Sequence, residues 1–185
     1  KLEDCNPTSF ENKKKIELIT GAKGNLGEDT VAVVRCNGGN FCLDKFEYQG
    51  YGDCTSAEII AGGTKMCKVG CMGLATCTKV CPHFAIELKS DGFAYVEREL
   101  CTSCGACIAS CPKSLISRIP RSAPVYVACS NDSKGRDVRN MCSHGCIACG
   151  LCAKVCPTKA ITMVNNLPVI DYELCNGCLK CVHTC

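Results

Sequence analysis

The spacing of the cysteines near the end of the sequence constrains this chain more than any other feature. The pattern Cys-x2-Cys-x2-Cys-x3-Cys occurs twice: at Cys146, Cys149, Cys152 and Cys156, then at Cys175, Cys178, Cys181 and Cys185. Three thiolates spaced by two residues can curl around one 4Fe–4S cube, while the fourth leaves in another direction and ligates the neighbouring cube. The pattern therefore predicts two cubes that exchange their fourth ligands.

A second copy of this arrangement lies upstream. The segment 66–82 repeats in 141–157 with matching cysteines and a closing Cys-Pro, and 96–101 repeats in 170–175. One ligand differs, because the first copy has Leu74 where the second has Cys149. Cys67 and Cys142 each stand four residues before a loop. We infer that Cys67 replaces the missing ligand and that Cys142 is its unneeded counterpart.

The exchange rule then predicts four 4Fe–4S clusters with sixteen ligands. The predicted sets are Cys67, Cys71, Cys77 and Cys111; Cys101, Cys104, Cys107 and Cys81; Cys146, Cys149, Cys152 and Cys185; and Cys175, Cys178, Cys181 and Cys156. Six cysteines remain: Cys5, Cys36, Cys42, Cys54, Cys129 and Cys142. They are either buried free thiols or, apart from Cys5, the parts of a further metal site.

Composition supports bound clusters as structural elements. Cysteine accounts for 22 of the 185 residues and there is no Trp, so little other apolar material is left for a core. Cluster binding must then be part of folding, and we expect the cluster-free chain to be largely unfolded. Disulfide scaffolds do not repeat this spacing, and structural zinc sites use pairs of CxxC, so both alternatives are disfavoured.

Charge and motifs exclude several other functions. The formal net charge is +3, but each oxidised cube adds about −2, so four would bring the loaded protein to roughly −5. We therefore expect no nucleic-acid partner. The run 13–15 of lysines predicts a solvated helix face, with a partner or lipid contact as the alternative. No acid–base pair, nucleophile motif or dinucleotide fingerprint is visible, and His83, His144 and His183 are expected to tune or pack beside the cysteine loops.

Several helices and strands can be placed from the pattern of the residues. We expect a helix capped by Ser9 and ended by Gly21, a strand over 31–35, and a short helix opening at Thr55 with Glu58 as its capping partner. Two hairpins are predicted, 84–88 with 93–96 and 160–164 with 167–170, and short helices are expected after Cys81, Cys111 and Cys156.

The predicted fold class is α+β, with two tandem bacterial-type two-cluster ferredoxin modules preceded by a small α/β segment that contains cysteines. We expect an N-terminal segment over 1–65, a first module over 66–118, a connecting strand and loop over 119–139, and a second module over 140–185.

Several motifs of the chain are similar to those of a known family. These are Val33-Val34-Arg35-Cys36, Tyr48-x-Gly50-x2-Asp53-Cys54, Cys67-x3-Cys71-x5-Cys77-x3-Cys81-Pro82, and the tandem cysteine runs. Together they resemble the B subunit of Rnf complexes, the membrane-bound ferredoxin:NAD oxidoreductases that couple electron flow to sodium or proton transport.

The resemblance implies an electron-transfer subunit with no substrate-converting site of its own. Its implied partners are soluble ferredoxin and other subunits of a membrane oxidoreductase complex, and its implied location is the cytoplasmic face of the cell membrane. In that family an anchor and a cysteine-rich domain precede this region, and Cys5 resembles the last ligand of that domain. The chain begins at Lys1 rather than Met and its longest uncharged run, 140–153, is too short to span a bilayer. We therefore expect a fragment that is peripheral as it stands.

Two other functions stay open at this point. One is a polyferredoxin-like electron-transfer subunit of another anaerobic oxidoreductase, such as a hydrogenase. The other is a regulatory protein that senses oxygen, although four clusters argue against it because one would suffice. Basic residues beside the cysteine loops favour an acidic ferredoxin as the electron donor. They are Lys68, Lys79, Lys113, Lys154 and Lys180.

Overall fold

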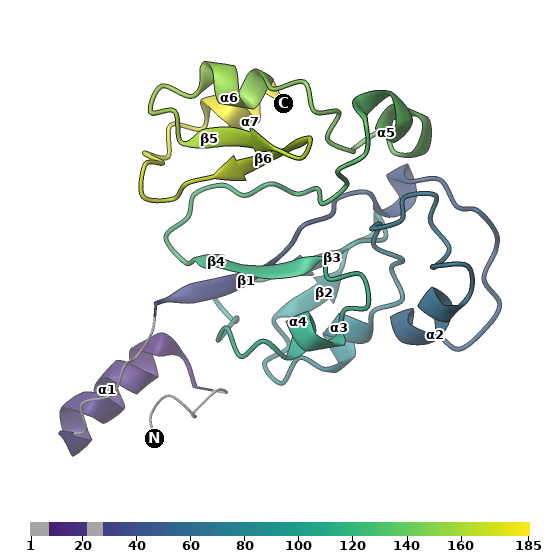
Figure 1. The fold of residues 1–185 in the computed structure, drawn as a ribbon. Helices are drawn as coiled ribbons and strands as arrows, with labels where there is room; N and C mark the ends of the chain where they lie inside the picture. The colour runs from purple at the N-terminus through teal and green to yellow at the C-terminus, as the bar shows by residue number, and fades with distance from the viewer. Residues whose placement is uncertain (1–7, 22–27) are drawn as a thin grey trace.

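The computed structural model describes residues 8–21 and 28–185 (Figure 1). Cys5 and most of the glycine-rich segment after Gly21 lie outside the described residues. The first helix, α1 (Phe10–Thr20), is confirmed with both of its predicted ends. Ser9 Oγ accepts the Asn12 N–H at 3.3 Å, and Gly21, at φ 66°, donates its N–H to the Glu17 carbonyl. No residue of α1 is buried, and the helix projects from the body of the molecule.

The core is built on a two-stranded antiparallel sheet, β1 (Thr30–Val34) with β4 (Ile116–Pro120). The predicted strand over 31–35 is thus confirmed to within one residue, and four of the five residues of β1 are buried. Its partner β4 was not predicted. The strand expected in the connection over 119–139 was wrong, since β4 ends at Pro120 and residues 121–139 contain no strand. The N-terminal segment and the first cysteine repeat therefore share one sheet.

Two similar units surround or face this sheet. The first contains α3 (Thr76–Lys79), the hairpin of β2 (Ile86–Leu88) and β3 (Ala94–Val96), and α4 (Ala106–Ser110). The second contains α6 (Leu151–Val155), the hairpin of β5 (Ile161–Val164) and β6 (Leu167–Ile170), and α7 (Lys180–Thr184). Both predicted hairpins are confirmed. In Figure 1 the second unit lies above the sheet and the first below it.

We expected the short helices of these units to follow the Cys-Pro pairs. This was wrong, because each helix precedes its Cys-Pro pair. Helices α4 and α6 end directly before Cys111 and Cys156, whose backbones are extended with ψ 108° and ψ 114°. Both cysteines stand before a proline, which disfavours the helical conformation in the preceding residue. Each helix therefore delivers its Cys-Pro residue by ending there.

Three further elements depart from the expectations. Helix α2 (Cys54–Ile59) begins at Cys54 rather than Thr55, because Asp53 is its N-cap and accepts the Ser56 N–H at 2.8 Å. The segment expected as a polar loop ends in α5 (Gly135–Met141), and η2 (Gly39–Phe41) forms one 3₁₀ turn. Within 8–21 and 28–185, no helix has the length and apolar character needed to cross a membrane.

Candidate iron–sulfur sites

Two of the predicted cysteine sets each surround one cavity. Cys81 meets Cys101, Cys104 and Cys107 around a cavity of about 310 Å³. In the second unit the corresponding cavity, of about 340 Å³, brings together Cys156, Cys175, Cys178 and Cys181. In both cases the Cys-Pro residue comes from the other cysteine loop, so the structure places these side chains as the exchange rule predicts.

The predicted first set is placed differently. Cys71, Cys77 and Cys111 line a cavity of about 450 Å³, but its fourth cysteine is Cys54 and not Cys67. Cys54 begins α2, and its backbone N–H donates to Thr76 Oγ1 at 2.7 Å, which ties the helix to the Cys77 loop. Cys67 lines a separate cavity. The sequence offered no spacing that pairs Cys54 with this loop, so it remained among the leftover cysteines.

The third set also lies together, at the surface of the second unit. Burial, and then the neighbouring thiolates of Cys146, Cys185 and Cys149, raise the pKa of Cys152. Cys149 and Cys185 are exposed, whereas the cysteines of the first unit are buried or partly buried. The second unit therefore presents its thiols to solvent more openly than the first.

Backbone N–H groups point at several sulfurs. Cys101 Sγ accepts the N–H groups of Ala32 (3.5 Å) and Ser103 (3.4 Å), and Cys81 Sγ accepts that of Ala85 (3.3 Å). Ala32 lies on the buried strand β1, so the sheet itself supplies a donor to a predicted ligand. Such bonds stabilise thiolates and tune the potential of a bound cluster.

The pKa values of the buried thiols indicate what cluster binding requires. Burial and nearby thiolates raise the pKa of Cys77 to about 12, and the same causes raise the pKa of Cys107 to about 11. These groups are therefore protonated at neutral pH in the metal-free chain. Because a ligating thiol must be deprotonated, cluster assembly releases protons.

The donor sets fit a cube rather than a single ion. Thiolates are soft ligands, and they suit iron–sulfur clusters as well as Zn and Cu(I). Among the described residues, no three Cys, His, Asp or Glu side chains converge closely enough to hold one metal ion. The cysteines instead surround cavities, as ligands at the corners of a cube do.

Three segments of the chain match known domain families. Residues 66–122 match the LdpA Fe-S cluster-binding domain, while 100–160 and 145–185 each match a 4Fe-4S dicluster domain.

Similar proteins extend the match over the whole chain. The B subunit of the ion-translocating oxidoreductase complex of Methanosarcina acetivorans is 38% identical over 185 residues, which cover all of this chain and 70% of the relative. The chain belongs to this family of B subunits. It is also 43% identical over 168 residues to the B subunit of the Na(+)-translocating ferredoxin:NAD(+) oxidoreductase complex of Acetobacterium woodii, covering 90% of the chain and 50% of the relative.

A third relative is the B subunit of the proton-translocating ferredoxin:NAD(+) oxidoreductase complex of Clostridium ljungdahlii. It is 40% identical over 184 residues, covering 98% of the chain and 65% of the relative. The resemblance to the B subunit of Rnf complexes is thereby confirmed. The chain spans between half and about seven-tenths of the length of these three relatives.

In this member of the family the basic residues beside the cysteine loops divide into two kinds. Lys68, Lys79, Lys154 and Lys180 are exposed, as a docking role requires. Lys113 is not: its side chain is only 6% exposed, pairs with Glu58 at 2.7 Å, and donates to the carbonyls of Gly62 and Lys68. Lys113 therefore stabilises buried polar groups and is not part of a charged surface.

The three histidines lie at the cysteine loops, as expected. His83 lines the cavity of Cys81, and the ring of His144 packs on that of Phe41 with centroids 3.7 Å apart. His183 lies on α7.

Proposed function

We propose that this chain is an iron–sulfur electron-transfer subunit that carries electrons from reduced ferredoxin into a membrane-associated ferredoxin:NAD oxidoreductase, which pumps sodium ions or protons. The observation that carries the proposal is the convergence of cysteine quartets in two linked units, in a chain that belongs to this family of B subunits. Two relatives are named for sodium and proton translocation respectively, so both ions stay within the proposal.

Four cysteine sets would hold the 4Fe–4S clusters of this relay. They are Cys54, Cys71, Cys77 and Cys111; Cys81, Cys101, Cys104 and Cys107; Cys146, Cys149, Cys152 and Cys185; and Cys156, Cys175, Cys178 and Cys181. A bound 4Fe–4S cube supplies one-electron chemistry. The residues supply the thiolates, the N–H groups that tune them, and the exclusion of water. In this arrangement, the two halves are tandem two-cluster ferredoxin modules.

Exposure supports the second unit as the end that exchanges electrons with a partner. Leu174 and Val182, which adjoin Cys175 and Cys181 in the sequence, are each about half exposed, and Lys154 and Lys180 are exposed on the helices of this unit. Exposed apolar and basic groups together suit a short-lived contact with an acidic protein such as ferredoxin. The other partners would be further subunits of the complex, at the cytoplasmic face of the membrane.

The test is the rate at which reduced ferredoxin reduces the cluster-loaded chain in an anaerobic stopped-flow experiment. The rate should fall as ionic strength rises, because salt screens the steering charges. The double variant Lys154→Ala/Lys180→Ala should slow reduction, whereas Lys14→Ala, which removes an exposed charge from α1, should not. A rate that is independent of salt and of these variants would count against ferredoxin docking at this unit.

A further inference from the structure

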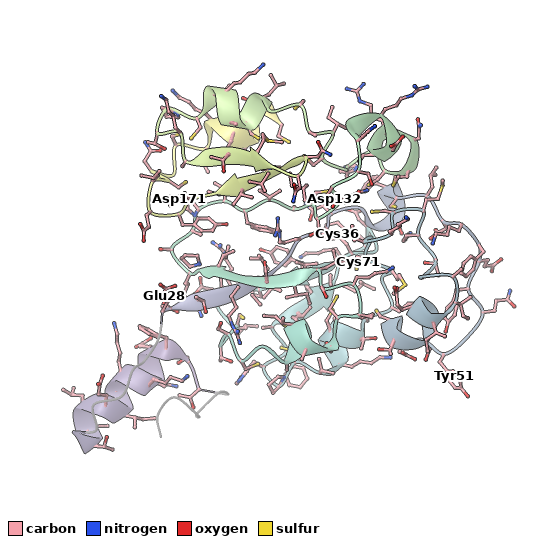
Figure 2. All side chains as sticks on the ribbon, viewed as in Figure 1. Glu28, Cys36, Tyr51, Cys71, Asp132 and Asp171 are labelled. Carbon is pink, nitrogen blue, oxygen red and sulfur yellow. The ribbon has the colours of Figure 1, made fainter. Side chains whose placement is uncertain are left out.

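Five cysteines outside the four quartets meet at the junction of the two units. They line one cavity of about 340 Å³ and are Cys36, Cys42, Cys67, Cys129 and Cys142. Three of them, Cys42, Cys67 and Cys142, are buried and form a small core cluster of their own, against which Val69 and Met141 pack. Figure 2 shows Cys36 beside Cys71 in the middle of the molecule, between the upper and lower units.

N–H groups donate hydrogen bonds to sulfurs that line this cavity. Asn131, which is only 5% exposed, donates from Nδ2 to Cys67 Sγ at 3.3 Å. Cys36 Sγ accepts two backbone N–H groups, from Gly38 and from Cys71, both at 3.4 Å. Free thiols of a hydrophobic core need no such donors, whereas ligating thiolates are held and tuned by them.

A glycine lies in the wall of the cavity, and a buried lysine lies next to Cys42. Lys65 is buried, donates from Nζ to the Cys42 carbonyl at 3.3 Å, and lies 3.1 Å from Asp44 Oδ1. Its ammonium group is paired with the Asp44 carboxylate and fixes the Cys42 backbone at the edge of the site. A Cβ on Gly38 would lie 3.3 Å from Cys142 Sγ and 3.5 Å from Cys36 Sγ, so a side chain at this position would crowd the two sulfurs.

The internal repeat relates four of these cysteines in pairs. The segment leading to Cys36 corresponds to the one leading to Cys129, and Cys67 corresponds to Cys142. The contacts follow the same pairing, because the Cys71 N–H donates to Cys36 Sγ and the Cys146 N–H donates to Cys129 Sγ, both at 3.4 Å. Cys42 has no counterpart, since Gly135 stands at the equivalent distance after Cys129.

We propose that Cys36, Cys67, Cys129 and Cys142 hold a fifth 4Fe–4S cluster, which connects the clusters of the two units. Like the site of Cys156, Cys175, Cys178 and Cys181, the junction gathers at least four thiols from separate segments around one cavity, which suits a cube of the same kind. Cys42 is an additional thiol in its wall.

The position of the site gives the connecting role its physical basis. Cys71 belongs to the quartet of the first unit and Cys146 to a quartet of the second, and each donates directly to a sulfur of the junction. A cluster held there would accept one electron from a reduced cluster of one unit and pass it to the other unit, with no bond broken and no proton moved. This role rests on the proposed electron-transfer function, whereas the occupancy of the site does not.

Iron and sulfide analysis of the anaerobically loaded chain tests the occupancy without any variant. Five clusters predict about 20 iron and 20 sulfide per chain, and four predict about 16 of each. The variants Cys36→Ser and Cys129→Ser should each lose one cluster's iron, whereas Cys42→Ser should keep all five. A wild-type value near 16 would overturn the fifth site, and loss of iron in Cys42→Ser with full retention in Cys129→Ser would overturn the pairing.

Rapid-freeze paramagnetic resonance tests the connection. In Cys129→Ser chains that retain four clusters, electrons given to one unit should reach the other at least about tenfold more slowly than in the wild type. An unchanged rate would overturn the connecting role. Failure of ferredoxin to reduce a chain with 20 iron would instead count against the proposed function and leave the fifth site standing.

Discussion

Replacing Lys113 should destabilise one cluster site selectively. Its side chain lines the cavity of Cys54, Cys71, Cys77 and Cys111 and holds three neighbouring segments together. Nζ lies 2.7 Å from Glu58 Oε2 on α2, 2.7 Å from the Gly62 carbonyl and 2.6 Å from the Lys68 carbonyl. Lys113→Met keeps the aliphatic stem but leaves Glu58 without its counter-ion and both carbonyls without this donor. Helix α2, which delivers Cys54, is then held less firmly.

The structure sets the size of the effect. Removing one partner of a buried ion pair costs about 3–5 kcal/mol, and the 32% exposure of the Glu58 side chain places this pair near the lower end, about 3 kcal/mol. If local opening is fast relative to iron capture, the rate of iron loss follows the opening equilibrium. A cost of about 3 kcal/mol then corresponds to an acceleration on the order of 100-fold.

The assay is anaerobic bleaching of the visible absorbance by an iron chelator. Lys113→Met should add a fast phase whose amplitude is the share of a single cluster, while the other clusters bleach as in the wild type. Lys113→Met/Glu58→Leu should bleach more slowly than the single variant, because no unpaired charge remains. Lys79→Met is the matched control, since Lys79 donates to the Gly52 carbonyl at 2.9 Å from an exposed position. Wild-type bleaching of Lys113→Met, or a double variant as fast as the single one, would refute the reasoning.

Three further predictions follow from the same placement of cysteines. Cys54 and Cys77 line one cavity and Cys67 lines another. The double variant Cys54→Ser/Cys77→Ser should therefore lose the iron of one cluster, and Cys67→Ser/Cys77→Ser should lose the iron of two. Equal losses by iron analysis would contradict this. Cys156→Ser should damage the cluster of Cys175, Cys178 and Cys181 rather than that of Cys146, Cys149 and Cys152, and paramagnetic resonance showing the reverse would refute the exchange of ligands. When a chelator removes the iron, the second unit should become sensitive to trypsin before the first, because only Ala160, Ile161 and Pro168 are buried between 147 and 185. Mass spectrometry that finds cleavage after Arg118 before cleavage after Lys159 would argue against this order.

Local chemistry made a large part of the fold predictable. Ser9 and Gly21 bound α1 because a side-chain acceptor and a left-handed glycine satisfy the two helix ends. The turn of the second hairpin follows from Asn165 and Asn166, which take φ 47° and 63°, as a type I′ turn requires. The spacing of the cysteines was also enough to predict which side chains meet around two of the cavities.

Contacts between distant segments could not be obtained in this way. The spacing indicated that a ligand was missing at Leu74, but the cysteine that lines the cavity with Cys71, Cys77 and Cys111 is Cys54. Its place depends on the Asp53 cap and the bond to Thr76. The nearer Cys67 was the simpler choice from the sequence. The pairing of β1 with β4 was missed for a related reason, because Ile116–Pro120 follows a Cys-Pro loop and carries Pro and Arg.

The most direct test of the central claim is a coulometric titration of the anaerobically loaded chain. Each cube accepts one electron, so the chain should take up about five electrons, from dithionite and from reduced ferredoxin alike. Uptake near zero, or uptake from dithionite with none from ferredoxin, would contradict the account of this chain as an iron–sulfur relay.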